Sequence, residues 1–162
     1  MRIVLLSTVL LLSTPVFANQ GVEAQLYTNL NSAIVSLGDK IKECEEGAKS
    51  NNPDATTIKL VRENLEQLAP LLSHVNDLAE ERCSLNERKE LAYQILLAKN
   101  NSKRQSTLEL IQSVEQLTFE QDVEMKNRFK ALSSIVKKQL LQNPFFSKPF
   151  NVLELYESAI QM

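Results

Sequence analysis

The sequence contains few of the residues that build reactive sites. It has one histidine, two cysteines, three glycines and no tryptophan. A single histidine, with no CxxC or HxxxH spacing, excludes the common zinc motifs. Three scattered glycines exclude a glycine-rich phosphate loop, and a nucleophile-elbow motif is also absent. The sequence therefore predicts no catalytic residue, no metal site and no cofactor.

Strand-like alternation of apolar and polar residues is missing as well. Leu, Glu, Lys, Gln and Ala are abundant instead, and these are strong helix formers. Apolar residues recur every three or four positions, which is the period of a helix with one buried face. We predict an all-α, single-domain antiparallel bundle of about five to six helices over residues 19–162.

The N-terminus differs from the rest of the chain. Arg2 is followed by a mainly apolar run over residues 3–12 and then by Val16-Phe17-Ala18, a small-x-small pattern. This order is typical of a signal peptide, here residues 1–18 with cleavage after Ala18. The alternative, a membrane anchor, needs about 20 apolar residues, more than this run provides. We expect a mature chain that is periplasmic or secreted.

Cys44 and Cys83 are predicted to form a disulfide, because an oxidising compartment favours pairing over two buried free thiols. The geometry is demanding, since the two Cα atoms must lie within about 6.8 Å. A straight helical hairpin turning near Asn51 would carry Cys83 far past Cys44. A reversal or strong bend near Pro70 would bring the pair together, as would an extended segment over residues 47–57. We favour the reversal or bend.

Six segments carry the helical pattern: 22–44, 58–79, 84–98, 108–117, 123–140 and 151–160. Asn52 is the expected N-cap of the second segment, followed by Pro53 at the first helical position. Ser84 with Glu87 forms a predicted capping box for the third segment, and the pattern from Thr118 to Gln121 is expected to open the fifth. The proline-rich residues 143–150 cannot be helical throughout.

His74 is the only side chain suited to acid–base chemistry near neutral pH. Ser73 precedes it, but adjacent residues on a helix point in different directions and cannot form a nucleophile–base pair. His74 also flanks the apolar stripe of its helix, so we expect it at the boundary of the core. The protein is accordingly predicted not to be an enzyme.

Leu117-Thr118-Phe119-Glu120-Gln121 resembles the LTxxQ motif of the Spy/CpxP family of periplasmic helical stress chaperones. The resemblance implies a helical periplasmic protein with chaperone function. The chain departs from the family in having one copy of the motif, three methionines and a net charge of −2. The same residues also fit an N-cap threonine with a glutamine at N3.

Charge is distributed unevenly along the chain. Residues 19–98 hold 13 acidic and 8 basic residues, whereas residues 126–153 contain no acidic residue. We predict a partner-binding surface in this acid-free region, directed at an acidic protein surface or, weakly, at an anionic membrane. Alternatively, the lysines are solvated and the phenylalanines lie in the core. The predicted surface consists of Lys126, Lys130, Lys137, Lys138, Phe145, Phe146 and Phe150.

These patterns together predict an exported, non-catalytic protein that binds another protein and not nucleic acid. It would be a monomer or a homodimer. An immunity protein against a cell-envelope toxin ranks first by analogy, followed by an envelope stress chaperone and a secretion accessory.

Overall fold

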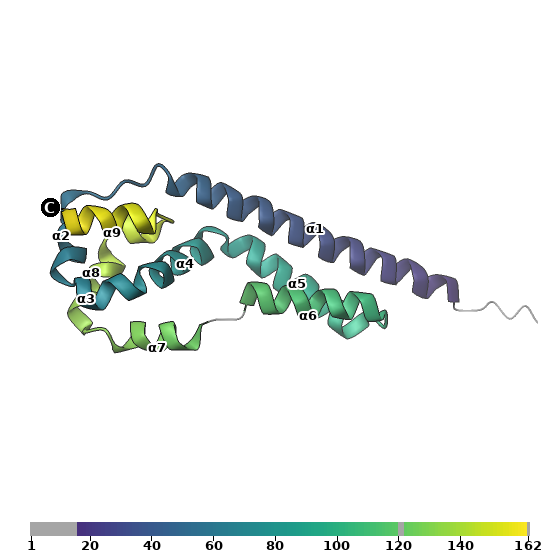
Figure 1. The fold of residues 1–162 in the computed structure, drawn as a ribbon. Helices are drawn as coiled ribbons and strands as arrows, with labels where there is room; N and C mark the ends of the chain where they lie inside the picture. The colour runs from purple at the N-terminus through teal and green to yellow at the C-terminus, as the bar shows by residue number, and fades with distance from the viewer. Residues whose placement is uncertain (1–15, 120–121, 162) are drawn as a thin grey trace, which may run out of the picture.

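The protein is an all-α helical bundle (Figure 1). The computed structural model describes residues 16–119 and 122–161, and no strand occurs in these ranges. No helix of the described chain is both long enough and apolar enough to cross a bilayer. Most of the predicted signal peptide, residues 1–15, lies outside the described residues, so that prediction stays a prediction.

The elements are α1 (Val16–Ala48), α2 (Ala55–Glu63), α3 (Leu65–Leu68), the 3₁₀ turn η1 (Ala69–Leu71), α4 (Leu72–Cys83), α5 (Leu85–Asn101), α6 (Gln105–Phe119), α7 (Val123–Ala131), α8 (Ser134–Gln142), the 3₁₀ turn η2 (Pro144–Ser147) and α9 (Val152–Gln161).

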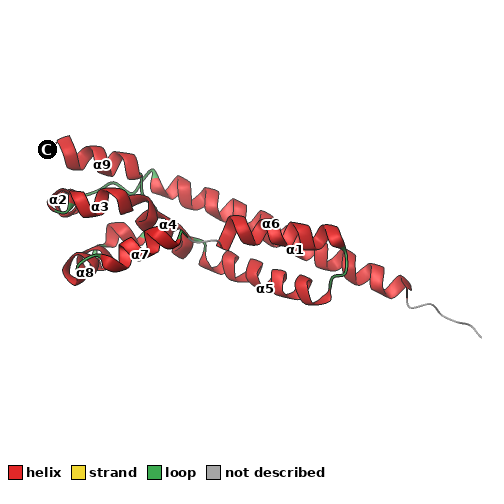
Figure 2. Ribbon diagram, turned by 60° about the horizontal axis from the view of Figure 1, so that its bottom comes forward, coloured by secondary structure: helices red, strands yellow, loops and turns green. Residues whose placement is uncertain are grey.

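The long helix α1 and helix α5 pack side by side in opposite directions (Figures 1 and 2). Near the start of α1, the Glu23 carboxylate accepts hydrogen bonds from the Ser102 hydroxyl and the Lys103 amide, just past the end of α5. Helix α6 then folds back along α5, and their exposed sides are joined by the Lys99–Glu115 ion pair at 2.6 Å. These three helices enclose the first core, here called the long-helix core: Leu30, Ala33, Leu37, Leu91, Ile95, Ala98 and Ile111.

A second group of helices encloses a separate core beyond the end of α1 (Figure 2). It is built by α2, α3, α4, α8, α9 and the two 3₁₀ turns, and we call it the C-terminal core. The Arg62 side chain ties α2 to α9 by donating to the Ala159 carbonyl at 3.2 Å. Its residues include Leu68, Leu72, Leu140, Phe145, Phe146, Phe150 and Leu155.

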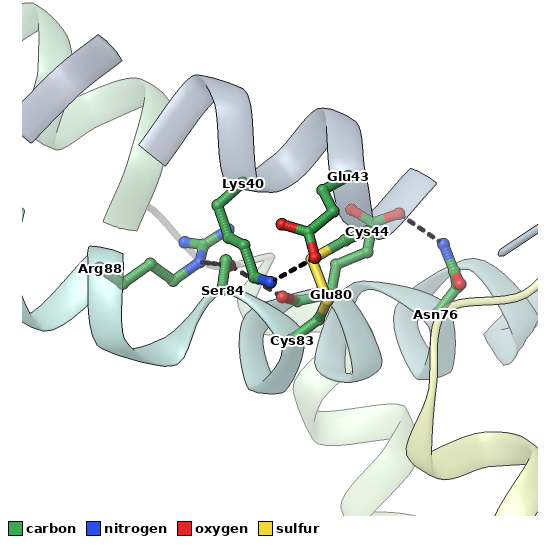
Figure 3. Close-up of a disulfide and its surroundings, with 8 residues drawn as sticks. All are labelled: Lys40, Glu43, Cys44, Asn76, Glu80, Cys83, Ser84 and Arg88. Carbon is green, nitrogen blue, oxygen red and sulfur yellow. Dashed lines mark hydrogen bonds and ion pairs between the residues drawn. A yellow bond between two sulfur atoms is a disulfide. The ribbon is translucent and has the colours of Figure 1, made fainter. Parts of the chain in front are cut away.

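The Cys44–Cys83 disulfide lies where the two groups of helices meet, between α1 and the end of α4 (Figure 3). The two Cα atoms are 6.1 Å apart, so the predicted bridge is confirmed. The helical pattern over residues 58–79 does not form one helix, in agreement with the favoured reversal or bend. That segment is divided into α2, α3, η1 and α4, and α2 points away from the line of α4 (Figure 1).

The reversal predicted near Pro70 is spread over a longer stretch of chain. Residues 51–54 are not helical and carry the chain past the end of α1. Asn64, with φ −124°, ends α2 and donates its side-chain amide to the Leu60 carbonyl. Pro70 then lies in the first turn of η1, where its missing N–H breaks no hydrogen bond. Helix α4 therefore returns alongside the end of α1 and brings Cys83 to Cys44.

Two predicted helix starts are corrected, and the third, with Ser84 as the N-cap residue of α5, is confirmed in position but not in its capping hydrogen bond. Asp54, not Asn52, caps α2, because its carboxylate accepts the Thr57 amide at 2.7 Å. Ser84 forms no capping bond and instead donates its hydroxyl to the Glu80 carbonyl. Thr118 lies inside α6 and opens no new helix. The side chains of serine, threonine and asparagine can form hydrogen bonds with several nearby backbone groups. The local sequence alone therefore does not determine whether such a residue caps a helix.

The predicted fifth helix is likewise interrupted. Its first part, α7, is capped by Asp122 and ends before Leu132. Ser133 then caps α8 by accepting the Val136 amide at 3.2 Å. Leu132, at the break, and Val136 of α8 both lie in the C-terminal core.

Replacing the N-cap Asp54 with alanine is expected to lower the melting temperature at neutral pH, whereas Asn52→Ala should leave it nearly unchanged. Hydrogen bonds from the hydroxyl and amide of Thr57 lower the pKa of Asp54. A carboxyl pKa that is lower in the folded protein contributes stability above its usual range, and this contribution is lost as the pH falls through the lowered value. Melting curves near pH 7 and pH 3 should therefore show a larger difference between the two variants at pH 7 than at pH 3.

Candidate functional site: a cleft between α4 and α7

A cleft of about 840 Å³ separates α4 from α7. It also reaches Arg88 of α5 and the last turn of α6, where Leu117 and Thr118 lie. Helix α7 packs mainly against η1 and has no fully buried residue. It stands apart from α4 along the lower edge of the molecule in Figure 1.

One wall of the cleft is acidic and belongs to α4. Asp77, Glu80 and Glu81 line it, and no described residue forms an ion pair with any of the three. Burial raises the pKa of Asp77, although the charge of His74 partly opposes this. Burial also raises the pKa of Glu80, against a hydrogen bond from Asn76 that lowers it.

The raised pKa values carry a consequence for stability. A carboxyl group with a raised pKa keeps its proton in the folded protein to a higher pH than in the unfolded chain. Stability therefore falls as the pH rises from the usual carboxyl pKa through the raised one. At neutral pH, the Asp77 and Glu80 carboxylates are thus held in a partly desolvated place that disfavours their charge.

The opposite wall is basic and apolar and belongs to α7. Lys126 and Lys130 are exposed and line the cleft together with Met125 and Phe129. Met125 and Phe129 are half-buried and pack against the C-terminal core at their base. At the mouth of the cleft, Leu117 has 87% of its surface exposed. The cleft therefore presents apolar area between the acidic residues of α4 and the lysines of α7, with Arg88 and Asp122 also in its lining.

His74 lies in this cleft and at the edge of the C-terminal core. It is half-buried, and its ring meets the ring of Phe129 edge-on, with centroids 5.6 Å apart. The expected boundary position is therefore confirmed. The ring contact with Phe129 is one of the few that hold α7 near α4.

The three predicted partner-binding phenylalanines lie in the C-terminal core. Phe145, Phe146 and Phe150 are 7%, 2% and 2% exposed, and their ring centroids lie 5.0 to 5.5 Å apart. Their placement corrects the expectation that these rings face a partner. Burial of three rings against one another removes more apolar surface from water than exposure on a loop would.

Polar side chains from distant helices hold the loop that carries these rings. The Asn51 amide donates to the Phe145 and Pro149 carbonyls, at 3.0 and 3.1 Å. The Phe150 amide donates to the Asn76 side-chain carbonyl at 2.8 Å. These contacts cross more than 70 positions of sequence, so no local pattern could have predicted them.

The four predicted lysines separate into two places. Lys126 and Lys130 line the cleft, whereas Lys137 and Lys138 lie on α8 outside it. Lys137 donates to the Lys130 carbonyl at 2.8 Å.

The sequence prediction missed the acidic wall and Leu117. The helical spacing of Asp77 and Glu81 relative to His74 was a usable signal, but only the fold shows what they face.

Comparison of this chain with protein-family models, with curated proteins and with solved structures finds no match. Of the residues that resemble the LTxxQ motif, Leu117, Thr118 and Phe119 form the end of α6. Residues 120 and 121 lie outside the described chain. The role of the cleft is therefore argued from its own geometry.

Proposed function

We propose that this protein is exported and acts by binding another protein in the cleft between α4 and α7. The observation that carries the proposal is the cleft itself, in which an exposed leucine and half-buried apolar side chains lie between an acidic and a basic wall. Apolar area surrounded by charged groups is the usual composition of a protein interface. Export is supported by the disulfide, which is characteristic of oxidising compartments.

The carboxylates of α4, which form no ion pair with any described residue, support the same proposal. Partial burial raises the pKa values of Asp77 and Glu80, although Asp77 is exposed over much of its surface, so their charged forms are disfavoured in this place. Residues that oppose folding are commonly retained where a binding site needs them. A partner that brings positive charge to this wall would remove the penalty.

A photo-crosslinking amino acid at position 117 tests the proposal. In the cells that make the protein, irradiation is expected to produce a covalent adduct with one protein, because the side chain at this position lies at the mouth of the cleft. The same amino acid at Tyr93, which is 54% exposed and outside the cleft, is the matched control.

Export is tested separately. Mass spectrometry of the unirradiated mature chain should give Asn19 as its first residue, because the predicted signal peptide is cleaved after Ala18.

The identity of the adduct separates the candidate partners. One stoichiometric adduct with a cell-envelope toxin is expected for an immunity protein, which we rank first. Adducts with many different proteins would indicate a chaperone. An adduct with a component of a secretion system would indicate a secretion accessory protein. Equal labelling from positions 117 and 93, or no adduct at all, would contradict binding in this cleft.

A further inference from the structure

We propose that the segment of the partner that enters the cleft is an amphipathic α-helix with one basic and one acidic flank. This inference rests on the proposed function and specifies its partner. The apolar stripe of that helix would lie on Leu117, Met125 and Phe129. Its basic flank would face α4, and its acidic flank would face α7.

The spacing of the lining residues is the first argument. On α4, His74, Asp77 and Glu81 line the cleft at intervals of three and four residues. On α7, Lys126 and Lys130 are likewise four residues apart. Each wall is thus one face of a helix, and side-chain ridges on two such faces leave grooves that fit the ridges of a third helix.

The size of the cleft agrees with a short helix. The lining residues of α4 run from Ser73 to Glu81, which is about 12 Å of helix at 1.5 Å per residue. This length corresponds to two to three turns of an entering helix. An extended peptide would bind best by pairing with a strand edge, and residues 16–119 and 122–161 contain no strand to pair with.

Charge complementarity assigns the flanks. Asp77 and Glu81 on α4 have no ion-pair partner among the described residues, and lysine or arginine side chains would supply one. On the opposite wall, the Lys130 ammonium group favours glutamate or aspartate, and Lys126, which already has an interaction within the chain, lies beside it. A helix with only one kind of charge would be attracted by one wall and repelled by the other.

Designed peptides test the inference on the mature protein. The probe is a fluorescent helical peptide of about four turns, with a leucine stripe, lysines on one flank and glutamates on the other. Its control has the same composition but mixes lysine and glutamate along both flanks. We expect the segregated peptide to bind about tenfold more tightly, which is about 1.4 kcal/mol, and to lose this advantage at high salt. Fluorescence anisotropy measures both dissociation constants.

Charge reversal on the protein provides the second measurement. Asp77→Lys with Glu81→Lys leaves Glu80 in place but gives the α4 wall a net positive charge, and should remove the advantage of the segregated peptide. Adding Lys126→Glu and Lys130→Glu exchanges the two walls. This should restore the advantage, because the same peptide can then bind in the reversed direction. The control pair Glu46→Lys and Glu157→Lys makes the same change in net charge at exposed positions outside the cleft and should have no effect. Circular dichroism verifies that each variant is folded.

Equal binding of the segregated and mixed peptides to the unmodified protein would overturn this inference. Failure of the exchanged walls to restore the advantage in a folded variant would also overturn it. Neither result affects the crosslinking from position 117, which tests protein binding without assuming a helix. An adduct at position 117 combined with equal peptide binding would therefore keep the proposed function and reject the helical partner.

Discussion

Removal of the Cys44–Cys83 disulfide is expected to lower the free energy of unfolding by about 4 kcal/mol. The bridge closes a loop between residues 39 positions apart, and the loop-entropy model gives this magnitude for a loop of that length. Most domains of this size are stable by only about 5–15 kcal/mol. The loss would therefore be a large part of the total stability.

The position of the bridge adds a second expectation. It joins α1, which belongs to the long-helix core, to the end of α4, which belongs to the C-terminal core. Without it, the connections between the two cores are the chain itself and the contacts of α4 with α1 and α5. We expect unfolding to become less cooperative, with a smaller dependence on urea concentration.

Urea denaturation of a Cys44→Ala, Cys83→Ala variant measures both effects. The unmodified protein under reducing conditions is the control and should show the same shift of the midpoint. A loss smaller than about 1 kcal/mol, which is below the usual range for such a loop, would contradict the expected role.

Truncation of Phe146 to alanine is expected to cost about 3–5 kcal/mol, the usual range for a buried aromatic residue. Phe146 is 2% exposed and meets Phe145 and Phe150 at centroid distances of 5.1 and 5.5 Å. Its backbone carbonyl also accepts a hydrogen bond from Arg82. Loss of the ring leaves a cavity that these fixed neighbours cannot fill.

Phe119 supplies the matched control, because the same ring is 39% exposed at the end of α6. Phe119→Ala should change the free energy of unfolding by less than about 1 kcal/mol. Thermal melting and urea denaturation compare the two variants. If Phe146→Ala melted like the unmodified protein and instead weakened partner binding, the ring would belong to a binding surface and not to the core.

Local features of the chain were sufficient for the fold class and for the disulfide. Apolar residues such as Leu30, Leu37 and Cys44 recur at the helical period, and this period is a property of neighbouring positions only. The geometric limit on a disulfide also anticipated that the chain must bend between Cys44 and Cys83. In both cases the physical constraint acts over short distances or through a single covalent bond.

The capping residues and the interruptions of the helices could be predicted less well from the sequence. Asn52 and Asp54 are equally good caps by residue type. The structure selects Asp54, while Asn51 is engaged by the loop that carries Phe145. The break between α7 and α8 was hidden because the apolar spacing continues through Leu132. Tertiary packing decides between local alternatives of similar energy.

Helical periodicity and the cysteine pair thus needed only the order of residues, since the forces involved act between near neighbours or through one bond. The burial of Phe145, Phe146 and Phe150 and the opening between α4 and α7 came from the fold alone. An exposed loop and a buried loop can have the same aromatic and proline content, and only the surfaces brought to it from elsewhere in the chain decide which one forms. The cleft likewise depends on where α7 is anchored, so its acidic and basic walls face each other across more than 40 residues of sequence.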